Sequence, residues 1–498
     1  MNVKKRTIST LLLSLFLLLV LLTPALAADG STKTYVYNEY GEDVNAPSAY
    51  LCTRVLRGRD LGLGDFSKIA DLYVNGNVYI SDTGNNRIVV LDPQYELVRV
   101  ISEVKENDAV TALSSPSSVF LAGGLLYICD TGNSRVIAVD ADDRVVKTFY
   151  KPDSDLLTED FAFKPSKVVV NSAGSVYIAA SGVYQGLLHY EADGGFIEFF
   201  GANKVEVTAA VLLKSMWMNI FSDEQRESLI RTVPTEYAGI FIDSEDMIYT
   251  TTITASTSQV KRLNASGENI LMYPGSSTSF LQRGYDRNNF GDQKTESVKG
   301  GLRRSQIMDV VVDEDNVIAV LDSQRGRVLL FYGEQNTLGI FGGSGTQDGY
   351  FTAVSALSKN GEEYLVADGM RNSVTVFAPT DYMQNIRRAL RAYEQGEYSE
   401  SRAYWESVLE SNAGLSVAAK GIGRSLLLEG NFHDAMRYLK MGDDRYYYSM
   451  ALTRYRRQFL RENSPWLVPC VILAVAAVCF GLRKLYVAIL RSGKGREK

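Results

Sequence analysis

The sequence predicts a mainly β protein: a six-bladed β-propeller, followed by a pair of α-helical hairpins and one transmembrane helix. Three observations predict this order. A strand–turn–strand phrase occurs six times, the hydrophobic period changes from two to about 3.6 after residue 380, and a long apolar run lies close to the C-terminus.

The N-terminus has the layout of a secretory signal peptide. Lys4, Lys5 and Arg6 precede an apolar run over residues 8–22, and Ala25-Leu26-Ala27 supplies the small-x-small pattern of a cleavage site. Residues 1–27 are therefore predicted to direct export and to be removed. The alternative is an uncleaved membrane anchor.

The repeated phrase predicts the blades. "YISDTGNNRIVVLD" at residues 79–92 returns as "YICDTGNSRVIAVD" at 127–140, and weaker copies begin near residues 177, 249, 319 and 365. Each copy follows another β-rich phrase, and the first five precede a fourth strand. Four short strands with turns between them are typical of a propeller blade, which must stack on its neighbours to bury both faces.

This phrase resembles the core of the NHL repeat, a family whose members form six-bladed propellers. The two copies at 79–92 and 127–140 match closely, whereas the copies near 177 and 249 have lost the Asp. The resemblance covers residues 33–379 and implies the fold more strongly than it implies a function.

The sixth unit lacks an outer strand, because the chain turns helical after "VTVFAP". The N-terminal phrase "YLCTRVLRG", residues 50–58, is predicted to supply that strand. Such pairing ties the two ends of the propeller together and leaves no free edge.

The turns inside the repeated phrases are predicted to be structural. Their carboxylates can accept turn N–H groups, their glycines permit positive φ, and their asparagines tolerate it. A metal site is the alternative, but acids spread over four blades do not point to one centre. The residues with this predicted role are Asp82, Gly84, Asp130, Gly132, Asp322 and Asp368. Three arginines that follow the turns, Arg87, Arg135 and Arg327, are expected to brace the next blade rather than to bind a ligand.

Two insertions are the predicted binding surface. They occupy residues 205–234 and 275–301, on the face that carries the repeated turns, and binding residues commonly lie on loops of a rigid scaffold. Four residues in these insertions are the best candidates, because aromatic rings offer a flat apolar contact area and arginine side chains offer paired hydrogen-bond donors. These are Trp217, Arg283, Tyr285 and Arg287. The alternatives are a packed helix face for Trp217 and a merely solvated loop for 275–301.

Residues 381–463 are predicted to form helical repeats. "YEQGEYSESRAYW" aligns with "LLEGNFHDAMRYL" at an offset of 34 residues, which matches Gly396 with Gly430 and Tyr398 with Phe432. The pattern resembles the tetratricopeptide repeat. Two repeats followed by a capping helix suit a stalk or a docking platform as well as a peptide-binding groove.

The apolar run from Trp466 to Leu482 is predicted to span the membrane, with Pro469 in its first turn. Together with the signal peptide it predicts a single-pass protein of the cell membrane. The N-terminal domains would be extracytoplasmic, and the basic tail, residues 483–498, cytoplasmic. Export and a net charge of −6 argue against nucleic acid as a partner. Only Cys52 and Cys129 would be exported, so no disulfide framework is expected.

The predicted function is that of a membrane-anchored binding or scaffold protein, whose propeller displays a ligand-binding or partner-binding face away from the membrane. Its partner would be a protein, glycan or peptide of the envelope, and by analogy it would be accessory to a bacterial envelope complex or solute transporter. No catalytic residue, metal ligand or cofactor is assigned. The alternative is a calcium-dependent, lactonase-like hydrolase, for which Asp71, Glu236 and Asp309 are the kind of oxygen ligands required. Two histidines exclude a zinc centre of several imidazoles.

Overall fold

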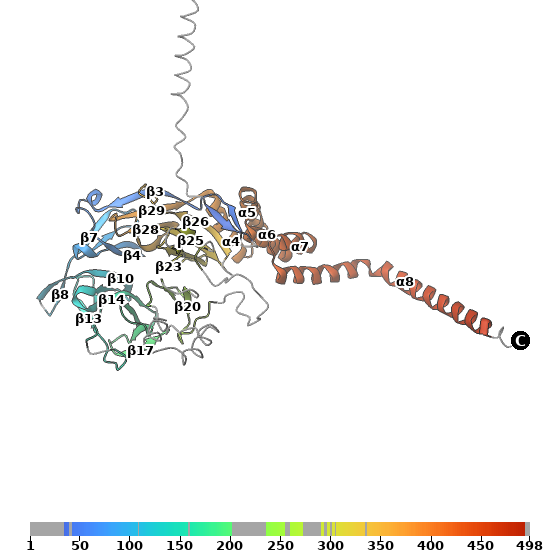
Figure 1. Ribbon diagram of the computed structural model, residues 1–498, viewed down its shortest axis with the longest axis horizontal. Helices are drawn as coiled ribbons and strands as arrows, with labels where there is room; N and C mark the ends of the chain where they lie inside the picture. Colours follow the sequence, from blue (N-terminus) through green and yellow to red (C-terminus); the bar gives the residue numbers. More distant parts are fainter. Residues whose placement is uncertain are drawn as a thin grey trace, which may run out of the picture. The chain divides into compact units, whose positions relative to one another are not determined.

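The structure is a computed structural model (Figure 1). It describes residues 34–38, 42–107, 109–157, 160–201, 236–253, 259–271, 290–292, 296–298, 301–303, 305–333 and 336–493. Two compact units divide the chain, residues 1–384 and 385–498. The predicted signal peptide lies outside the described residues.

Six antiparallel sheets form the first unit, and their innermost strands adjoin one another around a closed ring. The predicted six-bladed propeller is therefore confirmed. Blades one to three are β4 (Ile69–Asn75) to β7 (Leu97–Ile101), β10 (Pro116–Ala122) to β13 (Val145–Phe149) and β14 (Pro165–Val170) to β17 (Phe196–Phe200). Their middle strands are β5 (Asn77–Asp82), β6 (Arg87–Leu91), β11 (Leu125–Asp130), β12 (Arg135–Val139), β15 (Val176–Ala180) and β16 (Leu187–Tyr190).

The other three blades complete the ring. Blade four has β18 (Ile240–Ile242), β19 (Ile248–Thr251) and β20 (Val260–Leu263) within the described residues. Blade five consists of β23 (Ile307–Val312), β24 (Val317–Asp322), β25 (Arg327–Tyr332) and β26 (Asn336–Gly342). Blade six begins with β27 (Val354–Asn360), β28 (Glu363–Asp368) and β29 (Ser373–Pro379).

The N-terminal strand closes the ring as predicted. β3 (Tyr50–Arg57) pairs antiparallel with β29, with Val55 opposite Thr375 and Leu56 opposite Val374. Thr380, the residue after β29, donates its hydroxyl to the carbonyl of Ser48 at 2.7 Å. Sequence-distant ends are thus joined in one sheet, so the last blade has an outer strand.

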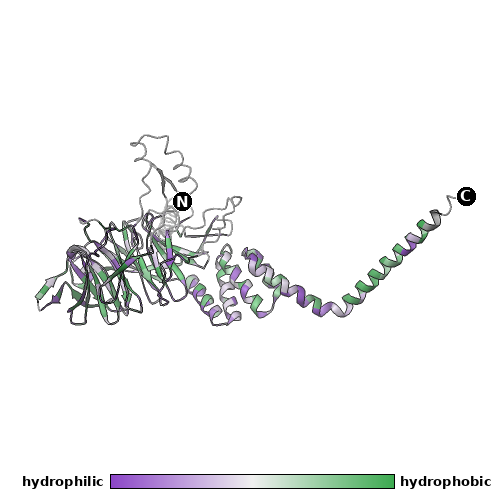
Figure 2. Ribbon diagram, turned by 90° about the horizontal axis from the view of Figure 1, so that it is seen from below, coloured by the Kyte–Doolittle hydropathy of each residue, from purple (hydrophilic) through white to green (hydrophobic). Residues whose placement is uncertain are grey.

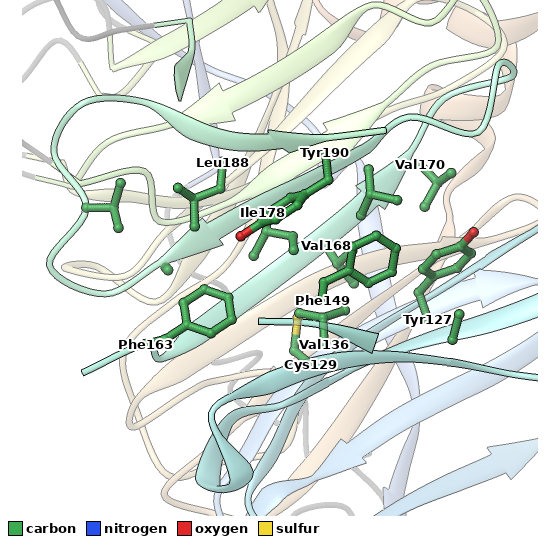
Figure 3. Close-up of a cluster of buried hydrophobic side chains, with 14 of the residues drawn as sticks. Tyr127, Cys129, Val136, Phe149, Phe163, Val168, Val170, Ile178, Leu188 and Tyr190 are labelled. Carbon is green, nitrogen blue, oxygen red and sulfur yellow. The ribbon is translucent and has the colours of Figure 1, made fainter. Parts of the chain in front are cut away.

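Alternating apolar residues hold adjacent blades together. Figure 3 shows the layer between blades two and three, where Phe149 and Tyr127 face Val168 and Tyr190. The rings of Phe149 and Tyr190 meet edge to face at 5.6 Å. Each such fully buried side chain contributes about 1.5–3 kcal/mol to folding, so the blades are stable only when stacked.

The glycines in the repeated turns have a different role from the predicted one. Positive φ falls on Asn86 and Ser134, both at +54°, and not on Gly84 or Gly132. A Cβ at Gly84 would lie 2.3 Å from the hydroxyl of Ser67, and one at Gly132 would lie 2.2 Å from that of Ser114. Close approach of the preceding loop therefore requires these two glycines.

In the part of the propeller that the structure describes, three short hairpins add to the blades, and none was predicted as a hairpin from the sequence. They are β1 (Tyr35–Tyr37) with β2 (Asp43–Asn45), β8 (Glu103–Glu106) with β9 (Ala109–Ala112), and β21 (Glu296–Val298) with β22 (Gly301–Arg303). The first hairpin is tied to blade five, because the Tyr35 and Tyr37 hydroxyls donate to the carboxylate of Asp292, which also pairs with Arg325 and Arg327.

Among the described residues, the α-helices begin with α4 at the end of the first unit and continue through the second. α4 (Asp381–Glu394) and α5 (Tyr398–Ser411) form one hairpin, and α6 (Ser416–Glu429) and α7 (Phe432–Met441) form another. The 34-residue alignment has a structural counterpart. Gly396 and Gly430 both adopt positive φ after a helix, Tyr398 and Phe432 both begin the next helix, and Ser401 and Ala435 are both fully buried.

The last helix, α8 (Arg445–Gly493), joins the predicted capping helix to the predicted span without a break. Pro469 therefore lies inside a helix and not in its first turn. Pro465 also lies inside this helix. The missing N–H of Pro465 frees the carbonyl of Arg461, which instead accepts from the Ser464 hydroxyl at 3.3 Å. Figure 2 shows the change to predominantly apolar residues towards the C-terminus of α8, and the helix is long and apolar enough to cross a membrane.

Candidate functional site in the axial cavity

A cavity of about 370 Å³ lies at the centre of the propeller. All six innermost strands line it. In blades one, two, three and five the lining begins at the third residue of the strand. It continues to the last residue of β4 in blade one and into the hairpin turns that follow the innermost strands of blades four, five and six. The cavity therefore opens at the face that carries these hairpin turns.

The inner end of the cavity is closed by charged side chains from three alternate blades. Lys167 of blade three places its Nζ 2.5 Å from Oδ1 of Asp71 in blade one and 3.2 Å from Oδ2 of Asp309 in blade five. These three residues, here called the axial cluster, are almost entirely buried. Ion pairs between non-adjacent blades must cross the propeller axis.

The strand geometry explains why the three side chains meet. Asp71, Lys167 and Asp309 are each the third residue of an innermost strand, next to a register shift where the strand bulges. The equivalent positions in the six blades form an axial ring. In blade order they are Asp71, Ser118, Lys167, Gly239, Asp309 and Ala356.

Small residues in the other three blades make room for the axial cluster. A Cβ at Gly239 would lie 2.7 Å from Oδ1 of Asp309 and equally close to the carbonyl oxygen of Met308. Glycine is therefore required there by the neighbouring carboxylate. Ser118 and Ala356 supply only short side chains at the remaining two positions.

The electrostatics favour a charged lysine. Burial by itself would lower the pKa of Lys167, but the charges of Asp309 and Asp71 raise it above the usual lysine value. Burial raises the pKa of Asp309, against the opposing effect of the Lys167 ammonium. Breaking such a buried pair is costly, because the remaining charge is left without a partner.

Aromatic rings form the wall above the axial cluster. Residues two positions further along the innermost strands face the same way, because side chains alternate along a strand. Tyr73, Phe120 and Phe241 occupy these positions in blades one, two and four and line the cavity. The Tyr73 and Phe120 rings lie 5.0 Å apart, and the Tyr73 hydroxyl donates to the carbonyl of Leu121 at 3.3 Å.

The mouth is rich in carboxylates. Asp243, Asp313 and Glu314 line it on the hairpin turns of blades four and five. Lys359 of blade six lies 3.4 Å from Asp313 and 3.2 Å from Glu314. The lining as a whole contains five carboxylates and two lysines, so it is acidic.

Four predicted binding residues, Trp217, Arg283, Tyr285 and Arg287, lie outside the described residues. The insertion at 205–234 follows β17 and precedes β18, whose ends lie at the face that carries the Asp82 and Asp130 turns. The axial cavity opens at the opposite face. The insertion surface therefore stays a prediction, separate from the cavity.

The four turn carboxylates share one contact. Each accepts the backbone N–H of a residue that precedes the innermost strand of its own blade. The pairs are Asp82 with Ser67, Asp130 with Ser114, Asp322 with Gln306 and Asp368 with Thr352, at 2.7, 2.7, 3.1 and 2.7 Å.

The sequence predicted that the three arginines brace the next blade, and this prediction is wrong. Arg87 and Arg135 bind the carboxylates of their own turns at 2.6 and 2.9 Å. They also bind the segment before their own blade, through the Leu63 carbonyl and the Glu106 carboxylate. Arg327 binds Asp292 and the Tyr35 hydroxyl. The guanidinium groups thus fix the connection that enters the blade.

The residues do not fit a calcium centre. Asp71 and Asp309 converge, but the Lys167 ammonium occupies the space between them, and Glu236 is not part of the cavity lining. Within the described part of the chain, no three His, Cys, Asp or Glu residues are grouped to hold a metal ion. A divalent cation there would meet a fixed positive charge.

Sequence reasoning missed Lys167 and the aromatic wall. A signal for them exists: each axial-ring residue precedes the Asp of the repeated phrase, or its equivalent, by 11 to 13 residues. Because these residues differ from blade to blade, an alignment that follows identical residues passes over them.

No family model matches the sequence, and no curated protein matches it. Among solved structures, the chain is similar to virginiamycin B lyase from Staphylococcus aureus, at 10% identity and a TM-score of 0.39, over 66% of this chain and 99% of that one. A gluconolactonase from Xanthomonas campestris matches at 10% identity and a TM-score of 0.36, over 70% and 96%. Hydrazine synthase from Kuenenia stuttgartiensis matches at 12% identity and a TM-score of 0.38, over 64% and 97%. At these values the similarities say nothing about activity.

Proposed function

We propose that this protein is a membrane-anchored, extracytoplasmic binding protein and that the axial cavity of its propeller holds the ligand. The observation that carries the proposal is the cavity itself, about 370 Å³ in volume, with an aromatic wall and a floor closed by ion pairs. Ligand sites have this size and this mixture of apolar wall and few polar groups.

The lack of fit for calcium favours binding over hydrolysis. A lactonase-like reaction on the axial carboxylates would need a metal in the position that the Lys167 ammonium occupies. The four turn carboxylates accept backbone N–H groups, and Asp82 and Asp130 also bind arginine side chains, so they support blades rather than chemistry.

The other parts of the chain fit this role. α8 would anchor the protein in the cell membrane, and the two helical hairpins, as tetratricopeptide-like repeats, would act as a stalk or a docking platform. An NHL-type propeller would present the cavity, and the insertions at 205–234 and 275–301 would contact a protein, glycan or peptide partner. With these parts the protein would serve as an accessory subunit of an envelope complex or solute transporter.

Native mass spectrometry of the full chain in lipid nanodiscs tests the proposal. The protein purified from its own membrane is expected to retain a small molecule. Phe120→Ala should lose that molecule, because it removes one side of the aromatic wall. Tyr150→Ala, an aromatic truncation at a 57% exposed residue at the end of β13, should retain it. A bound mass that survives Phe120→Ala, or no bound mass in the unaltered protein, would contradict the cavity as the ligand site.

A further inference from the structure

We propose that the ligand of the axial cavity is a small organic cation, an alkylammonium group attached to a compact apolar body. This inference rests on the proposed function, since it names the chemical class of the molecule that the cavity would take. The charged group would lie near Asp71, and the apolar body against Tyr73, Phe120 and Phe241.

The charge of the lining supports a cation. Five carboxylates line the cavity: Asp71, Asp243, Asp309, Asp313 and Glu314. Each of its two lysines already bridges two of them, Lys167 at the floor and Lys359 at the mouth. Asp243 pairs with Arg262, which is not part of the lining, at 3.5 Å. The lining retains a negative balance, and a concave, low-dielectric site focuses such a field on an entering ion.

Asp71 is the carboxylate that can accept a further hydrogen bond. Its Oδ1 accepts from Lys167, and its Oδ2 accepts no hydrogen bond from the described residues. Asp309, by contrast, accepts the N–H of Val310 through Oδ1 at 3.1 Å, and the N–H of Leu357 and the Lys167 ammonium through Oδ2. A carboxylate has about four acceptor sites, so Asp71 can take another donor.

The aromatic wall favours the same ligand. The negative face of an aromatic ring attracts a cation within about 6 Å of its centre. The Tyr73 hydroxyl donates to the carbonyl of Leu121 and accepts from the Asn75 amide at 3.2 Å, so both interactions are within the protein. The ring of Tyr73 lines the cavity and is available to contact the ligand.

An anion would be a poor fit. Its natural partners, the ammonium groups of Lys167 and Lys359, are each held by two carboxylates. It would also approach Asp71 and the carboxylates at the mouth. The same lining therefore selects against a sugar acid, a phosphate or a carboxylate.

Isothermal titration calorimetry of the full chain in nanodiscs can separate charge from shape. The cations are choline and n-butylammonium, and the neutral molecules of similar shape are 3,3-dimethylbutan-1-ol and 1-butanol. At least one cation is expected to bind tenfold or more tightly than its neutral counterpart. Asp71→Asn should remove most of that difference and leave the binding of the neutral molecule unchanged.

Two further variants keep the test independent of the stability of the Asp71 variant. Phe120→Leu should weaken the cation several-fold, because it keeps apolar volume but removes the ring face. Asp142→Asn, which removes a carboxylate with a side chain 68% exposed, should bind like the unaltered protein.

The outcomes distinguish this inference from the proposed function. Equal affinity for a cation and its neutral counterpart would overturn the inference, while a natural ligand lost in Phe120→Ala would still support the cavity as the binding site. Failure of both cations to bind would also overturn it. If no natural ligand depends on Phe120 either, the proposed function falls as well.

Discussion

Equivalent positions in the blades are of two kinds. In the repeated turns of blades one and two the side-chain contacts are the same, whereas in the axial ring the side chains differ. In the turns the contacts are copied: Asn85 reaches Asp82 at 2.9 Å, and Asn133 reaches Asp130 at 2.8 Å. The φ angles of the residues that follow these asparagines, Asn86 and Ser134, are both +54°. The same sequence has produced the same local structure twice.

The axial ring is equivalent in backbone and unlike in chemistry. Blades one, three and five contribute an acid, a base and an acid, whereas blades two, four and six contribute Ser118, Gly239 and Ala356. The three charges can pair only because the ring brings them to the axis. Repetition therefore supports each blade, and differences between blades create the axial cavity.

The largest effect is expected from breaking the axial cluster. Lys167→Met would leave two buried carboxylates without their cation, at a cost of about 3–5 kcal/mol in the free energy of unfolding. Urea unfolding of the full chain, followed by hydrogen exchange of peptides from β4, β14 and β23, measures this loss. Lys147→Met is the matched control, since within the described residues Lys147 donates only to the Ala192 carbonyl. A loss no larger than that of the control would contradict a central role for Lys167.

A restoring variant sharpens this test. Replacing Asp71 and Asp309 by Asn together with Lys167→Met removes all three charges, and much of the lost stability should return. Since the two carboxylates raise the pKa of Lys167, its stabilising charge is complete below the usual lysine pKa of about 10.4 and is lost as pH rises above it. The alkaline loss of stability should therefore be smaller in this triple variant than in the unaltered protein.

A smaller loss is expected from a repeated turn. Asp130→Ala removes the acceptor for Ser114, Asn133 and Arg135, although Arg135 keeps Glu106 at 2.7 Å. Leaving a buried donor unsatisfied costs about 1–3 kcal/mol. Chemical unfolding measures that cost, and calorimetry with the cavity ligand should show unchanged affinity. A weakened affinity with intact folding would show that the repeated turns also act on the site. Asp142→Ala serves as the surface control.

Sequence alone predicted the elements whose pattern repeats or has a fixed period. The six blades, the closing strand at residues 50–57 and the 34-residue helical offset all follow from such patterns. The reason for Gly84 could not follow, because its neighbour Ser67 belongs to the loop before the blade and approaches only in the folded chain. Asp71 and Asp309 were named only as candidate calcium ligands, and their pairing with Lys167 was missed for a related reason: Asp71 and Lys167 lie 96 residues apart and share only a position in the blade.

Not every difference between blades marks a ligand site. His189 differs from the residues at the equivalent positions of other blades, but it lies away from the propeller axis. It occupies the third-strand position held by Val90 and Ala138 in blades one and two. Its ring stacks on Tyr177 at 4.4 Å, and within the described structure neither ring nitrogen forms a hydrogen bond. A difference between blades here indicates packing with a titratable group rather than a ligand site.

The smallest expected effect follows from that burial, which lowers the pKa of His189 despite Glu198 at 3.7 Å. An unfolded histidine gains its proton as pH falls through about 6.5, whereas folded His189 gains it only at lower pH. The unaltered protein should therefore lose stability between pH 7.5 and 5.5, by less than either loss above. His189→Phe should reduce this pH dependence of the urea midpoint, and His433→Phe, at the exposed second histidine, should not. An undiminished pH dependence in His189→Phe would place the titrating group elsewhere.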